Sequence, residues 1–179
     1  MKISSRMLLS VLLAMAGSTA QAERADRNKP VGLEADRVSV DDKQKIQTFE
    51  GNVRLTQGTM SISTGKMVVR QDADGFQSGT AYGGTIANEG LARFKQKREG
   101  RSDFIEGEAE RIEHDNRTEK TEFHGRARVK SGLDEVRGAY ISYDGKTENY
   151  LVDGAGGKGR VTATIYPRDK TKPEATTKP

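Results

Sequence analysis

A ten-residue pattern occurs twice in this chain, and the repetition limits the folds that the chain can adopt. Residues 49–58 read FEGNVRLTQG, and residues 123–132, which lie 74 positions later, read FHGRARVKSG. Identical residues recur at the same offset over a wider span: Glu34/Glu108, Ala35/Ala109, Arg37/Arg111, Asp41/Asp115, Arg54/Arg128 and Gly58/Gly132. We therefore expect two structurally related halves.

Apolar and polar residues alternate in both copies of the pattern. In a strand, Val53 and Leu55 would point to one face and Arg54 to the other. The same period of two recurs along the chain between turn signals, at roughly the 8–12-residue spacing of an all-β sandwich or roll. No proline lies between residues 31 and 166, as a continuous hydrogen-bonded sheet requires. Gly51 and Gly125 are expected at bends in the strands.

The chain begins with a pattern typical of a secretory signal peptide. Lys2 and Arg6 precede an apolar stretch at residues 7–16, and Ala20-Gln21-Ala22 fits an A-x-A cleavage site. The apolar stretch is too short to span a bilayer. We expect cleavage after Ala22 and export to the periplasm. The expected organisation is a signal peptide at 1–22, a flexible segment at 23–29, one domain at 30–167 and a disordered tail at 168–179.

Composition excludes several classes of protein. The chain has 30 Lys and Arg against 26 Asp and Glu, so it lacks the strong basic excess of a nucleic-acid-binding protein. It has no cysteine, so disulfides and cysteine-based metal sites are impossible.

Catalytic and metal-binding motifs are weak. The stretch GAGGKG at 154–159 fits G-x-G-x-x-G, but the residues that follow alternate as a strand instead of opening a helix. His114 and His124 are the two histidines, and neither has a close partner in the sequence for zinc or acid–base chemistry. The acidic run at 106–115 lacks the ligand spacing of a calcium loop. We expect a protein that is not an enzyme and that uses no cofactor or metal.

Several segments together resemble the LptA-like family of periplasmic lipopolysaccharide transport proteins. They are KPVGLEADRVSVD, TFEGNVRLTQGTMSISTGKMVV, FHGRARV, ISYD and GKGRVTATIYP, within residues 29–167. The resemblance implies a twisted open β-jelly-roll in which two sheets form a V and hold lipid acyl chains between them. It also implies a carrier of lipopolysaccharide that is not an enzyme and that bridges the inner-membrane and outer-membrane components of an export machinery.

The resemblance also implies which residues meet the lipid. The groove is expected to be lined by Val31, Leu33, Val40, Leu55, Ile62, Phe94, Ile112, Val129 and Ile141. Each of these residues would serve an ordinary core equally well, so both interpretations stay open. Lys66 and Arg70 are candidates for contact with the anionic head group, although solvated turn charges would look the same.

The ends of the domain predict its partners. An open roll leaves unpaired strand edges, and residues 31–40 and 161–166 are alternating and free of proline, unlike protected edges. The resemblance implies who these partners are: an LptC-like inner-membrane partner of the same fold at the N-terminal edge and an LptD-like outer-membrane partner at the C-terminal edge. Copies of the chain are expected to stack head to tail as a homo-oligomer.

Two other functions remain open at this point. A secreted structural repeat protein on a β-scaffold would bury the same apolar stripe without binding lipid. A polysaccharide-processing enzyme would need converging carboxylates, for which the candidates are Asp36, Asp41, Asp115 and Asp144.

Overall fold

The computed structural model describes residue 26 and residues 29–73, 75–84, 90–98, 100–154 and 159–167. The expected signal peptide at 1–22 and tail at 168–179 lie outside these residues. The described part of the chain is all-β. It contains no helix that is both long and apolar enough to cross a membrane.

The strands form one hydrogen-bonded system that is folded over into two layers. Their bounds are β1 Gly32–Glu34, β2 Arg37–Asp41, β3 Ile46–Gln57, β4 Met60–Asp72, β5 Gly75–Tyr82, β6 Ala92–Lys97, β7 Phe104–Ala109, β8 Arg111–Asp115, β9 Lys120–Ser131, β10 Asp134–Asp144, β11 Asn149–Asp153 and β12 Thr162–Thr164.

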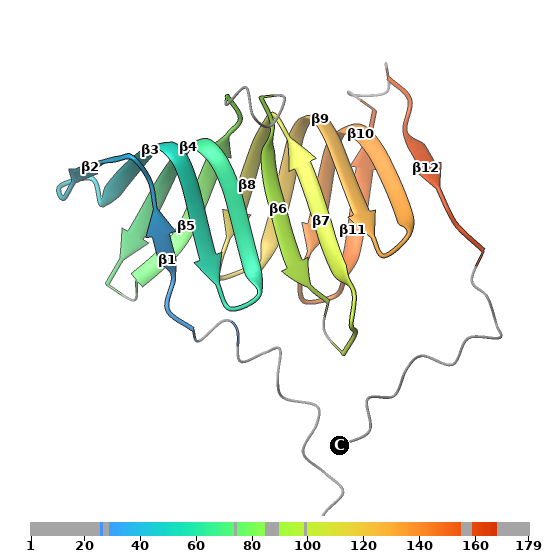
Figure 1. Cartoon of the computed structure of the whole chain (residues 1–179), viewed down its shortest axis with the longest axis horizontal. Coiled ribbons are helices and arrows are strands. Elements are labelled where there is room, and N and C mark those ends of the chain that lie inside the picture. The colour runs from blue at the N-terminus through green and yellow to red at the C-terminus, as the bar shows by residue number, and fades with distance from the viewer. Residues whose placement is uncertain are drawn as a thin grey trace, which may run out of the picture.

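Four long strands, β3, β4, β9 and β10, pass from one layer to the other. Residues 46–50 of β3 pair with β2, whereas residues 54–56 pair with β1. In the same way, residues 120–124 of β9 pair with β8, and residues 128–131 pair with β7. The layer that contains β6 and β7 faces the reader in Figure 1 and is called the front layer; the layer that contains β5 and β8 is the rear layer.

The bends that carry β3 and β9 between layers are built alike. Gly51 and Asn52 have φ of 78° and 46°, and Gly125 and Arg126, 74 positions later, have φ of 74° and 46°. Each pair lies where the register of its strand against the next one shifts: β3 against β4 in the first half and β9 against β10 in the second. Such a shift is expected for a bulge at a left-handed glycine. The sequence repeat therefore encodes the fold: each half contributes two long strands that pass between the layers, β3 and β4 in the first half and β9 and β10 in the second.

Turns also repeat at the same offset. Asp41 Oδ1 accepts the backbone N–H groups of residues 43 and 44, and Asp115 Oδ1 accepts those of residues 117 and 118. Lys45 and Glu119 then adopt left-handed conformations, with φ of 56° and 58°. An aspartate that accepts the N–H groups two and three residues ahead stabilises a tight turn without help from other elements. The hairpins β2–β3 and β8–β9 are fixed in this way.

The apolar core lies between the two layers. Phe94 of the front layer meets Phe123 of the rear layer edge to face, with ring centroids 5.8 Å apart. Gly107 of β7 leaves the space that the Phe123 ring occupies, since a Cβ at that position would overlap it. The other core residues come from inward-facing positions of both layers. The expected all-β jelly-roll of two related halves is confirmed.

Candidate functional site: the apolar interior and its two ends

Most of the residues expected to line a groove lie in the closed centre of the core. Their side chains are at most 2% exposed: Leu55, Ile62, Phe94, Ile112, Val129 and Ile141. Val31 and Leu33 are half-buried and pack against the same cluster. In this structure the central positions therefore contact other side chains of the chain itself, and whether lipid reaches them stays a prediction.

The interior face continues past the core onto β2, at the N-terminal end. Val38 stands opposite the buried Phe49 in the ladder, so both side chains point to the interior. Val38 and Val40 are nevertheless 54% and 55% exposed. Beside them lies a hollow of about 290 Å³, which is lined in part by Val40, Ile46 and Gln47. At this end the apolar face is uncovered.

The opposite end repeats this arrangement on β11 and β12. Tyr150 pairs with the buried Tyr143, and Ala163 pairs with Val136, which packs on the core. The alternation therefore places Tyr150 on the interior face, and it does the same for Ile165, two residues beyond Ala163. Tyr150 is 44% exposed and Ile165 is 78% exposed. Figure 1 shows β1 and β2 at one end of the long axis and β11 and β12 at the other.

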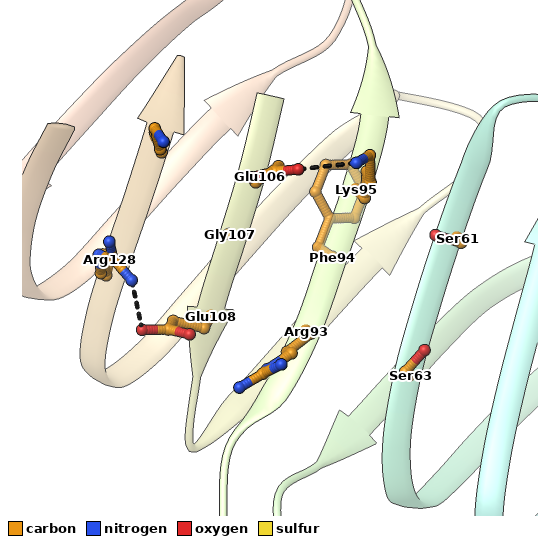
Figure 2. A pocket seen from close by; sticks show the side chains of 10 residues that line it. Ser61, Ser63, Arg93, Phe94, Lys95, Glu106, Gly107, Glu108 and Arg128 are labelled. Atoms are coloured by element: carbon orange, nitrogen blue, oxygen red, sulfur yellow. Dashed lines mark hydrogen bonds and ion pairs between the residues drawn. The ribbon is translucent and has the colours of Figure 1, made fainter. Parts of the chain in front are cut away.

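The outer face of the front layer is charged and concave. A hollow of about 430 Å³ lies over β4, β6, β7 and β9. Figure 2 shows that its polar side chains flank Phe94. Lys95 forms an ion pair with Glu106 at 2.8 Å, and Arg128 forms one with Glu108 at 3.1 Å. The same strands thus present charges outward and apolar groups inward, as their alternation predicts.

The two residues expected to contact a head group lie on the outer face of the rear layer. Lys66 forms an ion pair with Glu50, with 3.1 Å between Nζ and Oε1. Arg70 is exposed on the same face of β4. Neither side chain points into the interior, because the inward positions of this strand are Met67 and Val69. Their contact with a ligand remains a prediction.

The imidazole of His114 is enclosed in the core. His114 of β8 packs near the rings of Phe76 and Phe94, with centroids 6.5 and 6.4 Å away. Its Nδ1 lies 3.0 Å from the hydroxyl of Thr121. Burial lowers the pKa of His114 to about 4, against the smaller opposing effect of Asp115. The imidazole is therefore a neutral member of the core at neutral pH.

The carboxylates considered for catalysis serve as structural groups. Asp41, Asp115 and Asp144 each accept two backbone N–H groups of their own turn. Asp36 accepts a hydrogen bond from the Asn52 side chain at the bend of β3. The glycine-rich stretch also departs from a phosphate loop: Gly159 N–H donates to the Gly154 carbonyl, and strand β12 follows. Residues 155–158 lie outside the described part.

A two-layer β-roll with an apolar interior that emerges at both ends defines a scaffold for binding an elongated apolar molecule or further strands. Comparison with known proteins agrees with this class. Residues 32–149 match the model of the LptA/LptD N-terminal domain family of LPS transport proteins, and the chain belongs to this family. It is a family of carriers and not of enzymes.

Individual relatives cover nearly the whole chain. The lipopolysaccharide export system protein LptA of Haemophilus influenzae is 27% identical over 165 residues, which are 92% of this chain and 93% of that protein. LptA of Escherichia coli is 28% identical over 172 residues, which are 93% of this chain and 86% of that protein.

A solved structure supports the fold. The crystal structure of LptH from Pseudomonas aeruginosa is described as the LptA-homologous periplasmic component of the lipopolysaccharide transport device. It superposes with a TM-score of 0.71 and 24% identity, over 79% of this chain and 99% of that one.

Proposed function

We propose that this chain is a periplasmic carrier that holds the acyl chains of lipopolysaccharide in its apolar interior and bridges inner-membrane and outer-membrane components of the export machinery. The observation that carries the proposal is the uncovered interior face at both ends, where Val38 and Val40 at one end and Tyr150 and Ile165 at the other remain exposed. Membership of a family of lipopolysaccharide transport proteins supports this choice of ligand.

The physical argument starts from the chemistry of the ligand. Acyl chains gain about 0.8 kcal/mol for each methylene that is removed from water, so a transported lipid needs a continuous apolar path. The interior face offers such a path from β2 to β11, with charged residues such as Arg93 and Lys95 confined to the outer faces. For acyl chains to pass the centre, the front and rear layers have to separate where Phe94 and Phe123 now meet. The V-shaped arrangement of two sheets that the family resemblance implies would be such a separated state.

The edges supply the proposed partners. The backbone of β2 pairs on one side with β3, and that of β12 pairs on one side with β10, while each strand has no second partner among the described residues. An LptC-like protein at the N-terminal edge and an LptD-like protein at the C-terminal edge would continue the sheet by strand addition. Head-to-tail copies of this chain would use the same two edges.

Extraction of the purified protein and mass spectrometry of the lipids test the proposal. We expect lipopolysaccharide to copurify, and we expect added lipopolysaccharide to be taken up. Val40→Asp places a charge on the uncovered interior face and should reduce uptake, because an unpaired charge among acyl chains costs several kcal/mol. Ser39→Asp, one position away on the outer face of the same strand β2, is the matched control. Protein that takes up no added lipid while fully folded would contradict lipid carriage.

A further inference from the structure

Three side chains that can bind a metal meet on the outer face of the rear layer, away from the interior. Glu113 of β8 and Glu122 of β9 stand directly opposite each other in the ladder. His124 lies two residues further along β9 and shares the face of Glu122. Its Nε2 is 3.8 Å from Glu113 Oε1 and 3.9 Å from Glu122 Oε2. The three ligand atoms all lie within 4.8 Å of one another.

The distances from His124 Nε2 to the two carboxylate oxygens are close to those between neighbouring ligand atoms around a bound zinc ion. Nitrogen and oxygen ligands at about 2.0–2.2 Å from Zn²⁺ stand roughly 3.4 Å apart in a tetrahedral site. His124 Nε2 would have to approach each carboxylate oxygen by about half an ångström, and the two carboxylate oxygens, which lie within 4.8 Å of each other, would close by up to about 1.4 Å. Rotation of the two glutamate side chains can supply these shifts. Two carboxylates directly opposite each other in a ladder repel. Arg111 and Lys120 already offset this repulsion, and a cation between Glu113 and Glu122 would reduce it further.

The surroundings of Glu122 leave one of its oxygens available. The Tyr140 hydroxyl donates to Glu122 Oε1 at 2.6 Å, and Lys120 Nζ lies 2.7 Å from the same oxygen. Oε2 remains directed toward His124. The Tyr140 ring also packs against the imidazole, with centroids 5.1 Å apart. Contacts of this kind orient the ligands of metal sites.

Two polar atoms here have unsatisfied hydrogen-bonding capacity. His124 Nε2 is shielded from solvent and has no hydrogen-bond partner among the described residues. Arg111 Nε has none either, although it lies 3.0 Å from Glu113 Oε1. A shielded polar atom without a partner is costly. A metal bound to His124 Nε2 would satisfy the nitrogen, and Glu113 would exchange its ion pair with Arg111 for the metal.

The cluster is particular to the second half of the repeat. The equivalent positions in the first half are Ser39, Thr48 and Glu50, which cannot provide the same ligands. Where Tyr140 stands in the second half, Lys66 stands in the first and pairs with Glu50. The fold alone therefore does not require a histidine and two glutamates here.

We propose that Glu113, Glu122 and His124 form a divalent transition-metal site that takes Zn²⁺ and links β8 to β9. One imidazole with two carboxylates suits zinc better than calcium or magnesium, which prefer oxygen ligands alone. Water would complete the coordination from the side of Glu113, whose side chain is 40% exposed. The site is independent of lipid carriage.

Calorimetric titration of the protein with zinc chloride tests the proposal, on protein without a histidine tag. We expect one equivalent of zinc to bind. Binding should be lost in His124→Ala and in Glu122→Gln, and Tyr140→Phe should weaken it by roughly 10–100-fold, as the loss of an orienting contact does. Glu50→Gln, at the position equivalent to His124 in the first half, is the matched control and should leave binding unchanged.

A spectroscopic measurement on the unmodified sequence protects the test against variants that fail to fold. The chain contains two histidines, so their imidazole NMR signals are easily told apart. Zinc should shift the signals of His124 and leave those of the enclosed His114 in place. Absence of zinc binding, or binding that survives in a folded His124→Ala variant, would overturn the proposal.

Discussion

Phe94 of the front layer and Phe123 of the rear layer meet edge to face, with 5.8 Å between ring centroids, and this contact joins the two layers at the centre of the molecule. We expect Phe94→Ala to lower the free energy of unfolding by about 3–5 kcal/mol, because it leaves a cavity in a closed core. Urea denaturation measures the loss. Arg93→Ala, one position away on the outer face, should change stability by no more than about 0.5 kcal/mol. Equal effects of the two variants would contradict the assignment of faces.

The bends of β3 and β9 should be sensitive to a single methyl group. Gly51→Ala and Gly125→Ala each place a Cβ at a left-handed φ and against the carboxylate of Asp36 or Glu110. We expect each to cost about 1–3 kcal/mol, as strained backbone positions do. Chemical denaturation provides the measurement. Gly75→Ala, which has φ of 106° but open space around it, isolates the backbone contribution and should cost less. Insensitivity at either bend would show that the halves are not equivalent.

Stability should fall on moderate acidification because of His114. Its folded pKa is about 4, below its ordinary value of 6.5, so protons bind preferentially to the unfolded chain. The stabilisation that depends on neutral His114 is fully present above pH 6.5 and is lost as the pH falls toward 4. At 1.36 kcal/mol for each pKa unit, the loss approaches about 3 kcal/mol. Denaturation midpoints at pH 7 and pH 4.5 test this.

The variant that isolates the contribution is His114→Gln. It should be less stable than the unmodified chain at pH 7 and should show a flatter dependence between pH 6.5 and 4. A dependence that is as steep as before would assign the effect to other groups, such as the carboxylates.

The two ends should associate with each other in a defined polarity. We expect concentration-dependent chains in sedimentation velocity, because a head-to-tail contact does not close on itself. Val38→Asp should block growth at the N-terminal end, and truncation before Val161 should block growth at the C-terminal end.

Mixing the two blocked proteins gives the sharper test. Each is expected to be monomeric alone, whereas the mixture should form a heterodimer, because each retains the end that the other has lost. A mixture that stays monomeric at every concentration would contradict the head-to-tail contact.

The sequence predicted the repeat, the period of two and the bends at Gly51 and Gly125, because each of these depends on local residue preferences. It also predicted which face of a strand is apolar. It could not separate the closed centre, such as Leu55 and Phe94, from the uncovered ends, such as Val38 and Ile165. That distinction depends on which strand covers which, and no local pattern encodes it.

The cluster around His124 shows the same limit. Glu122 is visible as a neighbour two positions away, but Glu113 comes from another strand, and its place opposite Glu122 follows from the register of β8 against β9. The register becomes available once the Asp115 turn is known to hold the hairpin. The prediction that neither histidine has a close partner was wrong for His124, which has two carboxylates within 3.9 Å.

The 74-residue repeat has a consequence for how the length of an assembly of this protein is determined. The two halves follow each other along the long axis (Figure 1), and each adds two long strands that run through both layers. Among the described residues, the sheet of such a molecule ends only at the edge strands, which are β1 and β2 at one end and β11 and β12 at the other. If the proposed contact between these edges forms, the junction between copies repeats the junction between halves. The length of the assembly would then depend on the number of copies in it. A cell would match that length to the width of its envelope by the amount of protein that it makes, with no change in the gene.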